Sequence, residues 1–210
     1  DLVCRAGLHA KLDTGSRLPL TLVSAPAGYG KSTLLSHWLE CCDGRSAWLS
    51  LDDADSDIRG FCSYFVAAVR TVFSDACRET LDVLGSGKVL TVSVLSSYLL
   101  NDLDQIDEDF TIVLDDYHHV HGTAVHELLD DLLKYPPRPF HLVLTTRHDP
   151  PISLASLRAR GWLTEIRQDD LRFSQTEVRA VLEQMAGISV SDAALVHLEE
   201  KMEGWIVGLH

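Results

Sequence analysis

The chain alternates short apolar runs, rich in residues that favour β-strands, with longer segments whose apolar residues recur every three or four positions. The first kind of pattern predicts buried strands and the second predicts amphipathic helices. Five strands are predicted, at residues 18–24, 46–51, 110–116, 140–146 and 162–166. A short helix is predicted before the first strand, and further helices at residues 31–41, 58–72, 94–106, 124–133 and 154–160. Because helical crossovers join successive strands, we expect an α/β fold with a parallel five-stranded sheet flanked by helices.

The pattern becomes purely helical after the last predicted strand. Ser174 and Glu177 have the spacing of a capping box that opens a helix, and a second amphipathic helix is predicted at residues 193–202. We therefore divide the chain into a core at residues 1–170 and the start of a small helical lid subdomain at residues 171–210. A lid resting on a ligand would move according to which ligand is bound.

The loop after the first predicted strand carries a phosphate-binding pattern. It reads APAGYGKS and matches G-x-x-x-x-G-K-[ST], except that Ala25 replaces the first glycine. Glycines let successive N–H groups turn toward an anion, and the following helix dipole and the lysine add positive charge. The alternative is a plain helix N-terminus with a surface lysine, but the flanking strand and helix favour a nucleotide site. The predicted phosphate-binding residues are Ala27, Gly28, Tyr29, Gly30, Lys31, Ser32 and Thr33.

A second motif, FTIVLDD, ends the third predicted strand with two carboxylates. In an open α/β sheet, ligands bind beyond the carboxyl ends of the strands, so Asp115 and Asp116 should reach the phosphate loop. This is the Walker B arrangement, in which Asp115 and the Ser32 hydroxyl would serve Mg²⁺ and Asp116 would direct an attacking water. A strand that merely ends in a polar turn is the alternative.

Arg147 follows the fourth predicted strand and should lie at the same edge of the sheet. A guanidinium there is placed to sense the γ-phosphate or to stabilise charge during transfer, so Asp116, Arg147 and Lys31 are the predicted catalytic residues. The alternative is an arginine that pairs with Asp149 or is simply exposed.

Two clusters of polar residues are given structural interpretations. The acidic stretch at residues 52–57 does not complete a calcium-loop spacing, so it is interpreted as a solvated helix start capped by Asp57 or Ser56. The histidines at residues 118–126 offer poor tetrahedral geometry, and a transition-metal site there is not favoured. We expect His118 to brace the carboxylates through a hydrogen bond.

Composition limits the classes of function. The 210 residues are 46% hydrophobic and contain no apolar run long enough to span a bilayer and no signal segment, which favours a cytoplasmic domain. A formal charge of −13 argues against non-specific binding of nucleic acid by this segment, because the phosphate backbone would be repelled. The odd number of cysteines, without CxxC pairs, argues against a disulfide framework and a zinc site. Because the chain begins without Met and stops after an apolar segment, we expect a fragment of a larger protein.

Six motifs, in order and spacing, resemble the N-terminal ATPase domain of the MalT-like regulators, which are LuxR-type activators of the STAND class of P-loop NTPases. The motifs are SAPAGYGKSTLLSHWLE, WLSLDDAD, FTIVLDDYHHV, LVLTTR, LRFSQTEV and GWIVGL. The resemblance covers nearly the whole chain and implies an ASCE-type sheet, in which the strand ending at Arg147 lies between the phosphate-loop strand and the Asp115 strand. The last motif lacks the Gly-x-Pro signature of many STAND proteins, so adenine contacts stay unassigned.

The resemblance also implies a function. ATP and an inducer would drive self-association, ADP would favour a resting monomer, and slow hydrolysis with Mg²⁺ would reset the switch. DNA would be bound only through a C-terminal helix-turn-helix outside these residues, and the inducer through other domains. An AAA-like ATPase or P-loop kinase with steady turnover is the alternative, although a kinase should carry a phosphoryl-acceptor site and a basic lid.

Overall fold

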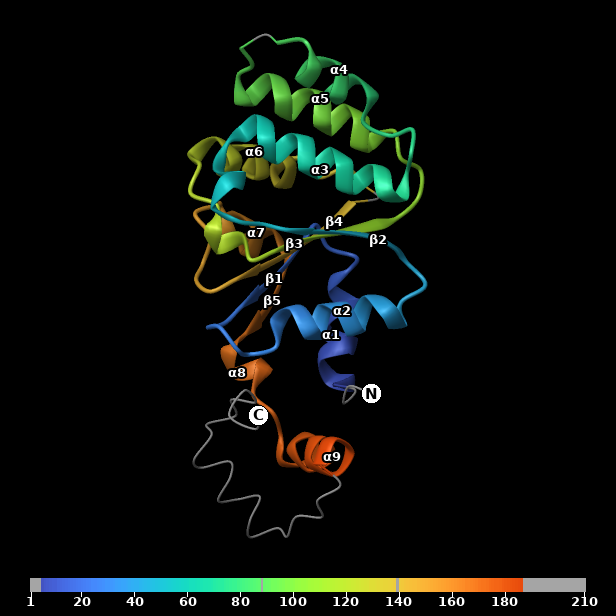
Figure 1. The fold of residues 1–210 in the computed structure, drawn as a ribbon, viewed down its shortest axis with the longest axis vertical. Helices are drawn as coiled ribbons and strands as arrows, with labels where there is room; N and C mark the ends of the chain where they lie inside the picture. Colours follow the sequence, from blue (N-terminus) through green and yellow to red (C-terminus); the bar gives the residue numbers. More distant parts are fainter. Residues whose placement is uncertain (1–4, 88, 139, 187–210) are drawn as a thin grey trace.

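The computed structural model describes residues 5–87, 89–138 and 140–186. A five-stranded parallel sheet lies at its centre, with helices on both faces (Figure 1). The strands are β1 (Leu20–Ser24), β2 (Arg45–Ser50), β3 (Phe110–Asp115), β4 (Phe140–Thr146) and β5 (Leu163–Arg167). All five predicted strands are confirmed, each with ends shifted by no more than two residues.

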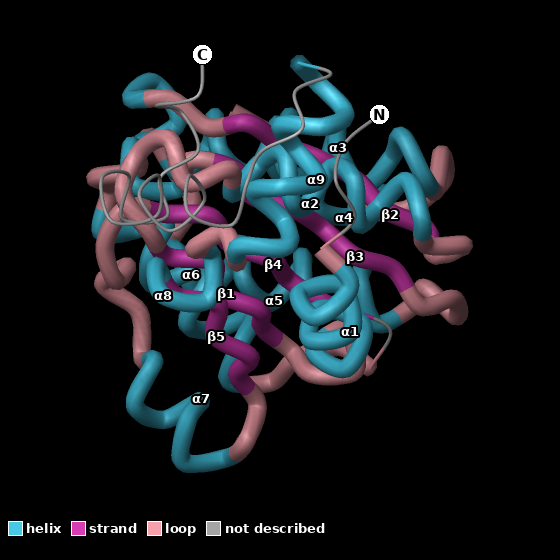
Figure 2. Tube along the Cα trace, turned by 90° about the horizontal axis from the view of Figure 1, so that it is seen from below, coloured by secondary structure: helices cyan, strands magenta, loops and turns pink. Residues whose placement is uncertain are grey.

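The strand order is β2-β3-β4-β1-β5, and the strands can be followed side by side in this order in Figure 2. β4 therefore lies between β1 and β3, as the resemblance to STAND proteins implied. This order brings the carboxyl ends of β1, β4 and β3 next to one another, so the loops that follow them share one edge of the sheet.

The helices form layers on the two faces of the sheet. In Figure 1, α1 and α2 cover one face, α3 and α6 cover the other, and α4 and α5 lie outside α3 and α6. Within the described residues, none of the helices combines the length and the apolar character that crossing a membrane requires. The helices are α1 (Ala6–Gly15), α2 (Lys31–Cys41), α3 (Ile58–Val72), α4 (Arg78–Gly85), α5 (Val92–Asp104), α6 (Thr123–Lys134), α7 (Leu154–Arg160), α8 (Gln168–Leu171) and α9 (Gln175–Ala186), with 3-10 turns η1 (Asp53–Ser56) and η2 (Tyr117–His119).

The core is divided by the sheet into two apolar clusters. Successive strand residues point to opposite faces, so Ile112 and Leu114 join the cluster under α3, α5 and α6, while Val113 joins the one under α1 and α2. All three are fully buried, and each such side chain contributes roughly 1.5–3 kcal/mol by leaving water. The central strands read as continuous apolar runs because both of their faces are covered.

The structure corrects the sequence predictions in three places. α4 was not predicted, because its eight residues bury little apolar surface beyond Leu84; Asp102 of α5 instead holds its first turn by accepting from Thr80 N at 2.8 Å. α8 is a single turn and was also missed. α5 begins at Val92, two residues before the helix predicted at residues 94–106, and Val94 is 39% exposed, because the buried face runs along Leu95, Leu99 and Leu103.

Both predicted caps are confirmed. The Asp57 carboxylate accepts from the Gly60 N–H at 2.8 Å and opens α3. At α9, Ser174 N donates to the Glu177 carboxylate at 2.8 Å and Glu177 N donates to Ser174 Oγ at 3.3 Å, which is a reciprocal capping box. The helix predicted at residues 193–202 and the motif GWIVGL lie outside the described residues, and the division after residue 170 stays a prediction.

Candidate nucleotide-binding site

The phosphate loop has the backbone that its glycines were expected to provide. Gly28 and Gly30 have positive φ values of 83° and 71°, and Gly30 is the N-cap residue of α2. Ala25 adopts no such angle, because Cys77 and Asp116 are the non-glycine residues with positive φ in the described chain. Alanine therefore fits the first position of the motif without strain.

Lys31 lies across its own loop. Its side chain is buried, and Nζ donates to the carbonyl oxygens of Ala25 at 2.9 Å and Pro26 at 3.1 Å. Burial lowers the pKa of Lys31, and the nearby Asp116 carboxylate opposes that shift. Ala27 of the loop and Thr33 of α2, both predicted to bind phosphate, are exposed.

Ser32 and Asp115 are brought together as predicted. Ser32 Oγ donates to Asp115 Oδ1 at 3.0 Å, although the two residues are 83 positions apart in the sequence. Two neighbouring ligands of an octahedral Mg²⁺ ion, each about 2.1 Å from the metal, lie about 3.0 Å from each other. The two oxygens therefore have the spacing that a Mg²⁺ ion would require, without movement of the backbone.

Thr145, at the end of β4, is a site residue that sequence reasoning missed. Its hydroxyl donates to Asp115 Oδ1 and accepts from the Asp116 N–H at 2.8 Å, and the residue is fully buried. One hydroxyl thus orients both acidic residues. The signal in the sequence was a threonine two residues before the expected sensor Arg147, which carries little information without knowledge of the strand order.

We expect Thr145→Val to weaken Mg²⁺-dependent nucleotide binding by about tenfold, because a lost hydrogen bond to a charged group is worth roughly 1.5–3 kcal/mol. Thr145→Ser keeps the hydroxyl and should restore most of that affinity. Equilibrium titration with and without Mg²⁺ measures the effect. An equal loss in the valine and serine variants would show that packing, and not the hydroxyl, is what matters at this position.

Asp116 has an unusual backbone. Its φ of 57° and ψ of 38° place it in the left-handed region, which costs a non-glycine residue roughly 1–3 kcal/mol and is found mainly where function requires it. Its N–H is held by Thr145, while its side chain is 46% exposed. The carboxylate lies close enough to Lys31 for its charge to act on the ammonium group.

His118 does not make the hydrogen bond that we expected. Its Nδ1 lies 3.7 Å from Asp116 Oδ1, and neither ring nitrogen has a hydrogen-bond partner among the described residues. Burial, followed by the positive charge of Arg147, lowers the pKa of His118 and keeps the ring neutral near pH 7. The bracing role belongs to Thr145 instead.

Arg147 lies just beyond β4 with an exposed side chain, close enough for its charge to influence both Lys31 and His118. The alternative partner, Asp149, is already bound by Arg167 and lies 3.5 Å from Arg158. The structure thus brings together the residues expected around a polyphosphate: Lys31, Ser32, Asp115, Asp116 and Arg147.

The segment after β5 is fastened to both the phosphate loop and the N-terminus. Gln168 Nε2 donates to the Tyr29 hydroxyl at 2.8 Å, at the tip of the loop. Arg5 donates to the carbonyl oxygens of Leu171 at 3.0 Å and Arg172 at 2.8 Å. Its guanidinium also pairs with Glu177 in α9 at 3.0 Å and lies 4.2 Å from the centre of the Phe173 ring.

No protein-family model matches the chain. The HTH-type transcriptional regulator MalT of Yersinia enterocolitica is 30% identical to it over 207 residues, which make up 99% of this chain and 23% of that protein. This chain is a homologue of the MalT regulators. MalT of Yersinia pestis gives the same values, so the chain spans about a quarter of the length of these relatives.

Solved structures show the same fold at low identity. A STAND protein with a tetratricopeptide repeat sensor from Pyrococcus horikoshii matches with a TM-score of 0.70 at 14% identity, covering 97% of this chain and 28% of that one. A Walker-type ATPase of Pyrococcus abyssi matches with a TM-score of 0.55 at 14% identity, covering 98% and 65%. The predicted P-loop NTPase fold, with its parallel five-stranded sheet, is confirmed.

Proposed function

We propose that this MalT homologue is the ATP- and ADP-binding switch domain of a LuxR-type transcriptional regulator. The observation that carries the proposal is the 3.0 Å contact between Ser32 and Asp115, beside the buried Lys31. The homology supplies the regulatory context, since the related Yersinia proteins are HTH-type transcriptional regulators. We place the domain in the cytoplasm as part of the same proposal, with DNA binding left to other parts of the protein.

Each residue of the site has a chemical role in this proposal. The N–H groups of the loop and Lys31 hold the β- and γ-phosphates, while Ser32 and Asp115 hold Mg²⁺, which neutralises charge on the phosphates. Asp116 orients the attacking water. Arg147 contacts the γ-phosphate and so distinguishes ATP from ADP.

A path for signalling leads from the phosphate loop to the C-terminal helices. Tyr29 at the loop tip is bonded to Gln168 in α8, and Arg5 ties the residues after α8 to α1 and α9. A shift of the loop on exchange of ATP for ADP would therefore reach α9 through two short steps. Self-association in the ATP state is the output that we assign to this movement, with an inducer acting through other domains.

The test is to identify the nucleotide that purified protein retains and to compare sedimentation in ATP·Mg²⁺ and ADP·Mg²⁺. A switch should retain ADP after extensive washing, turn over slowly and form larger species in ATP. Asp116→Asn should lower the hydrolysis rate by about 100-fold while leaving ATP bound, which lengthens the life of the ATP-dependent assembly.

Asp107→Asn, which changes an exposed carboxylate far from the phosphate loop, serves as the matched control and should behave like the parent protein. Fast steady-state hydrolysis with no change in sedimentation would favour the AAA-like or kinase alternative. Absence of any nucleotide affinity would overturn the proposal as a whole.

A further inference from the structure

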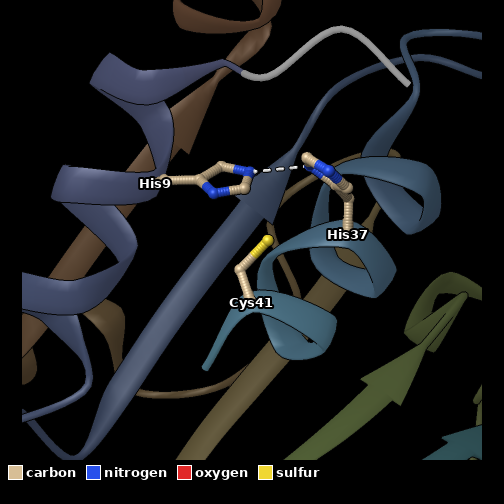
Figure 3. Close-up of side chains that lie close together, drawn as sticks. All are labelled: His9, His37 and Cys41. Atoms are coloured by element: carbon tan, nitrogen blue, oxygen red, sulfur yellow. Dashed lines mark hydrogen bonds between the residues drawn. The ribbon is translucent and has the colours of Figure 1, made fainter. Parts of the chain in front are cut away.

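A second cluster of ligating side chains lies away from the nucleotide site, between α1 and α2. His9 of α1 and the pair His37 and Cys41 of α2 point toward one another, as Figure 3 shows. One candidate ligand atom from each residue lies within 4.8 Å of the others. Within the part of the chain that the structure describes, this is the group of three or more His, Cys, Asp or Glu side chains whose ligand atoms lie close enough to hold one metal ion.

The spacing of the two imidazole rings fits a tetrahedral metal ion. His9 Nε2 and His37 Nδ1 are 3.3 Å apart. Two nitrogen ligands about 2.05 Å from a tetrahedral Zn²⁺ ion lie about 3.3 Å from each other. The facing nitrogens therefore have the required separation already, and the Cys41 sulfur lies within 4.8 Å of both.

The ligand positions are held by the packing of the two helices. His37 and Cys41 are four residues apart and so lie on one face of α2. One turn along the interface, Trp38 Nε1 donates to Asp13 Oδ1 of α1 at 2.8 Å, and Leu12 packs in the same apolar cluster. The helix backbones are thus fixed before any metal binds, which lowers the cost of assembling the site.

The protonation of the cluster also suits a metal. The two facing nitrogens share one hydrogen bond, so one proton at most lies between them, and a metal ion would replace it. The carboxylate of Asp13, one turn along α1 from His9, adds a negative charge near the site. Both rings are half-buried and Cys41 is exposed, so an ion has a path from solvent.

Cys41 is the described thiol best placed for this role. Cys62 and Cys77 are buried in the other apolar cluster, and burial raises the pKa of each to about 12, which keeps both protonated. Cys42 Sγ lies 3.7 Å from Asp13 Oδ1 and is engaged with that carboxylate. The cysteine spacing argued against a zinc site, because that pattern could not register a group in which two of the three side chains are histidines and one belongs to another helix.

We propose that His9, His37 and Cys41 bind a Zn²⁺ ion, with water in the fourth position. Two imidazoles and a thiolate suit a borderline-soft transition metal and not Mg²⁺, which prefers oxygen ligands. α2 begins at Lys31, beside the phosphate loop, and ends at Cys41. The ion would therefore tie the C-terminal end of α2 to α1. The proposal does not depend on the identity of the nucleotide or on the hydrolysis rate.

The test uses chelator-treated protein titrated with Co²⁺ in excess Mg²⁺, followed by competition between Zn²⁺ and a chromophoric chelator. One equivalent of Co²⁺ should give the visible bands of a tetrahedral ion and a near-ultraviolet thiolate charge-transfer band. Cys41→Ser should abolish the charge-transfer band. His9→Ala and His37→Ala should each weaken Zn²⁺ binding by at least about 100-fold, since even outer-shell changes cost 10–100-fold.

Cys42→Ser and His121→Ala, which alter a neighbouring thiol and an exposed histidine elsewhere, are the matched controls and should keep both bands. Circular dichroism checks the fold of each variant, and Cys41→Ser, at an exposed position, gives an answer even if a histidine variant fails to fold. A charge-transfer band that survives in Cys41→Ser, or no binding near one equivalent in the parent protein, would overturn the proposal.

Discussion

Replacing Lys31 with alanine should lower the affinity for ATP·Mg²⁺ and ADP·Mg²⁺ by about 10- to 100-fold. The ammonium group is buried beneath the phosphate loop, 2.9 Å and 3.1 Å from two of its carbonyl oxygens. A charge-assisted contact with phosphate contributes roughly 1.5–3 kcal/mol, and each 1.4 kcal/mol is worth about tenfold in affinity. Calorimetric titration of both nucleotides measures the loss.

The matched control for this experiment is Lys134→Ala, which removes an exposed lysine at the end of α6. It should bind both nucleotides like the parent protein. Thermal unfolding without nucleotide should be similar in the two variants, so a loss of affinity can be separated from a loss of folded protein. If Lys31→Ala binds ATP·Mg²⁺ as tightly as the parent, the phosphate-loop assignment is wrong.

Gly122→Ala should destabilise the fold strongly. A Cβ atom at this position would lie 2.0 Å from the carbonyl oxygen of Ser56, a distance that only movement of the backbone can relieve. The same contact holds the loop after β2 against the loop after β3, where His121 N donates to Ser56 Oγ at 3.0 Å. We expect a loss of about 3 kcal/mol in the free energy of unfolding.

For a chain of this size, that loss corresponds to a fall of roughly 6–12 °C in Tm. Gly44→Ala is the matched control, because a Cβ there meets nothing within 4 Å and the backbone needs no positive φ. Differential scanning calorimetry should show the control within about 2 °C of the parent. Equal Tm values for the two variants would mean that the two loops are not in contact as described.

Much of the fold could be predicted because its signals are local. β3 and β4 are buried on both faces and appear as largely apolar runs, and α3 carries one clear apolar stripe with Asp57 as its cap. The phosphate loop was equally accessible, since its chemistry depends on glycines and a lysine that are adjacent in sequence.

The features that were missed depend on contacts between distant segments. α4 is stabilised by Asp102, a residue of the next helix, and Thr145 matters only because β4 is inserted beside β3. His118 shows the opposite error. Its position in sequence close to Asp116 suggested a hydrogen bond, but with Asp116 in a left-handed conformation the two side chains are 3.7 Å apart. Propensity and periodicity describe neighbours along the chain, so they cannot identify partners of this kind.

Arg5 has a consequence for anyone who exchanges parts between relatives of this protein. Its bonds to Leu171, Arg172 and Glu177 join residues up to 172 positions apart, across the boundary predicted between the core and the helical lid subdomain. In a chimera joined at residue 171, Arg5 would come from one parent protein, and the residues at positions 172 and 177 that it contacts would come from the other. If the junction is placed after Glu177 instead, Arg5 and all of these partners come from the same parent protein. The contact between the two ends of the segment is then kept intact.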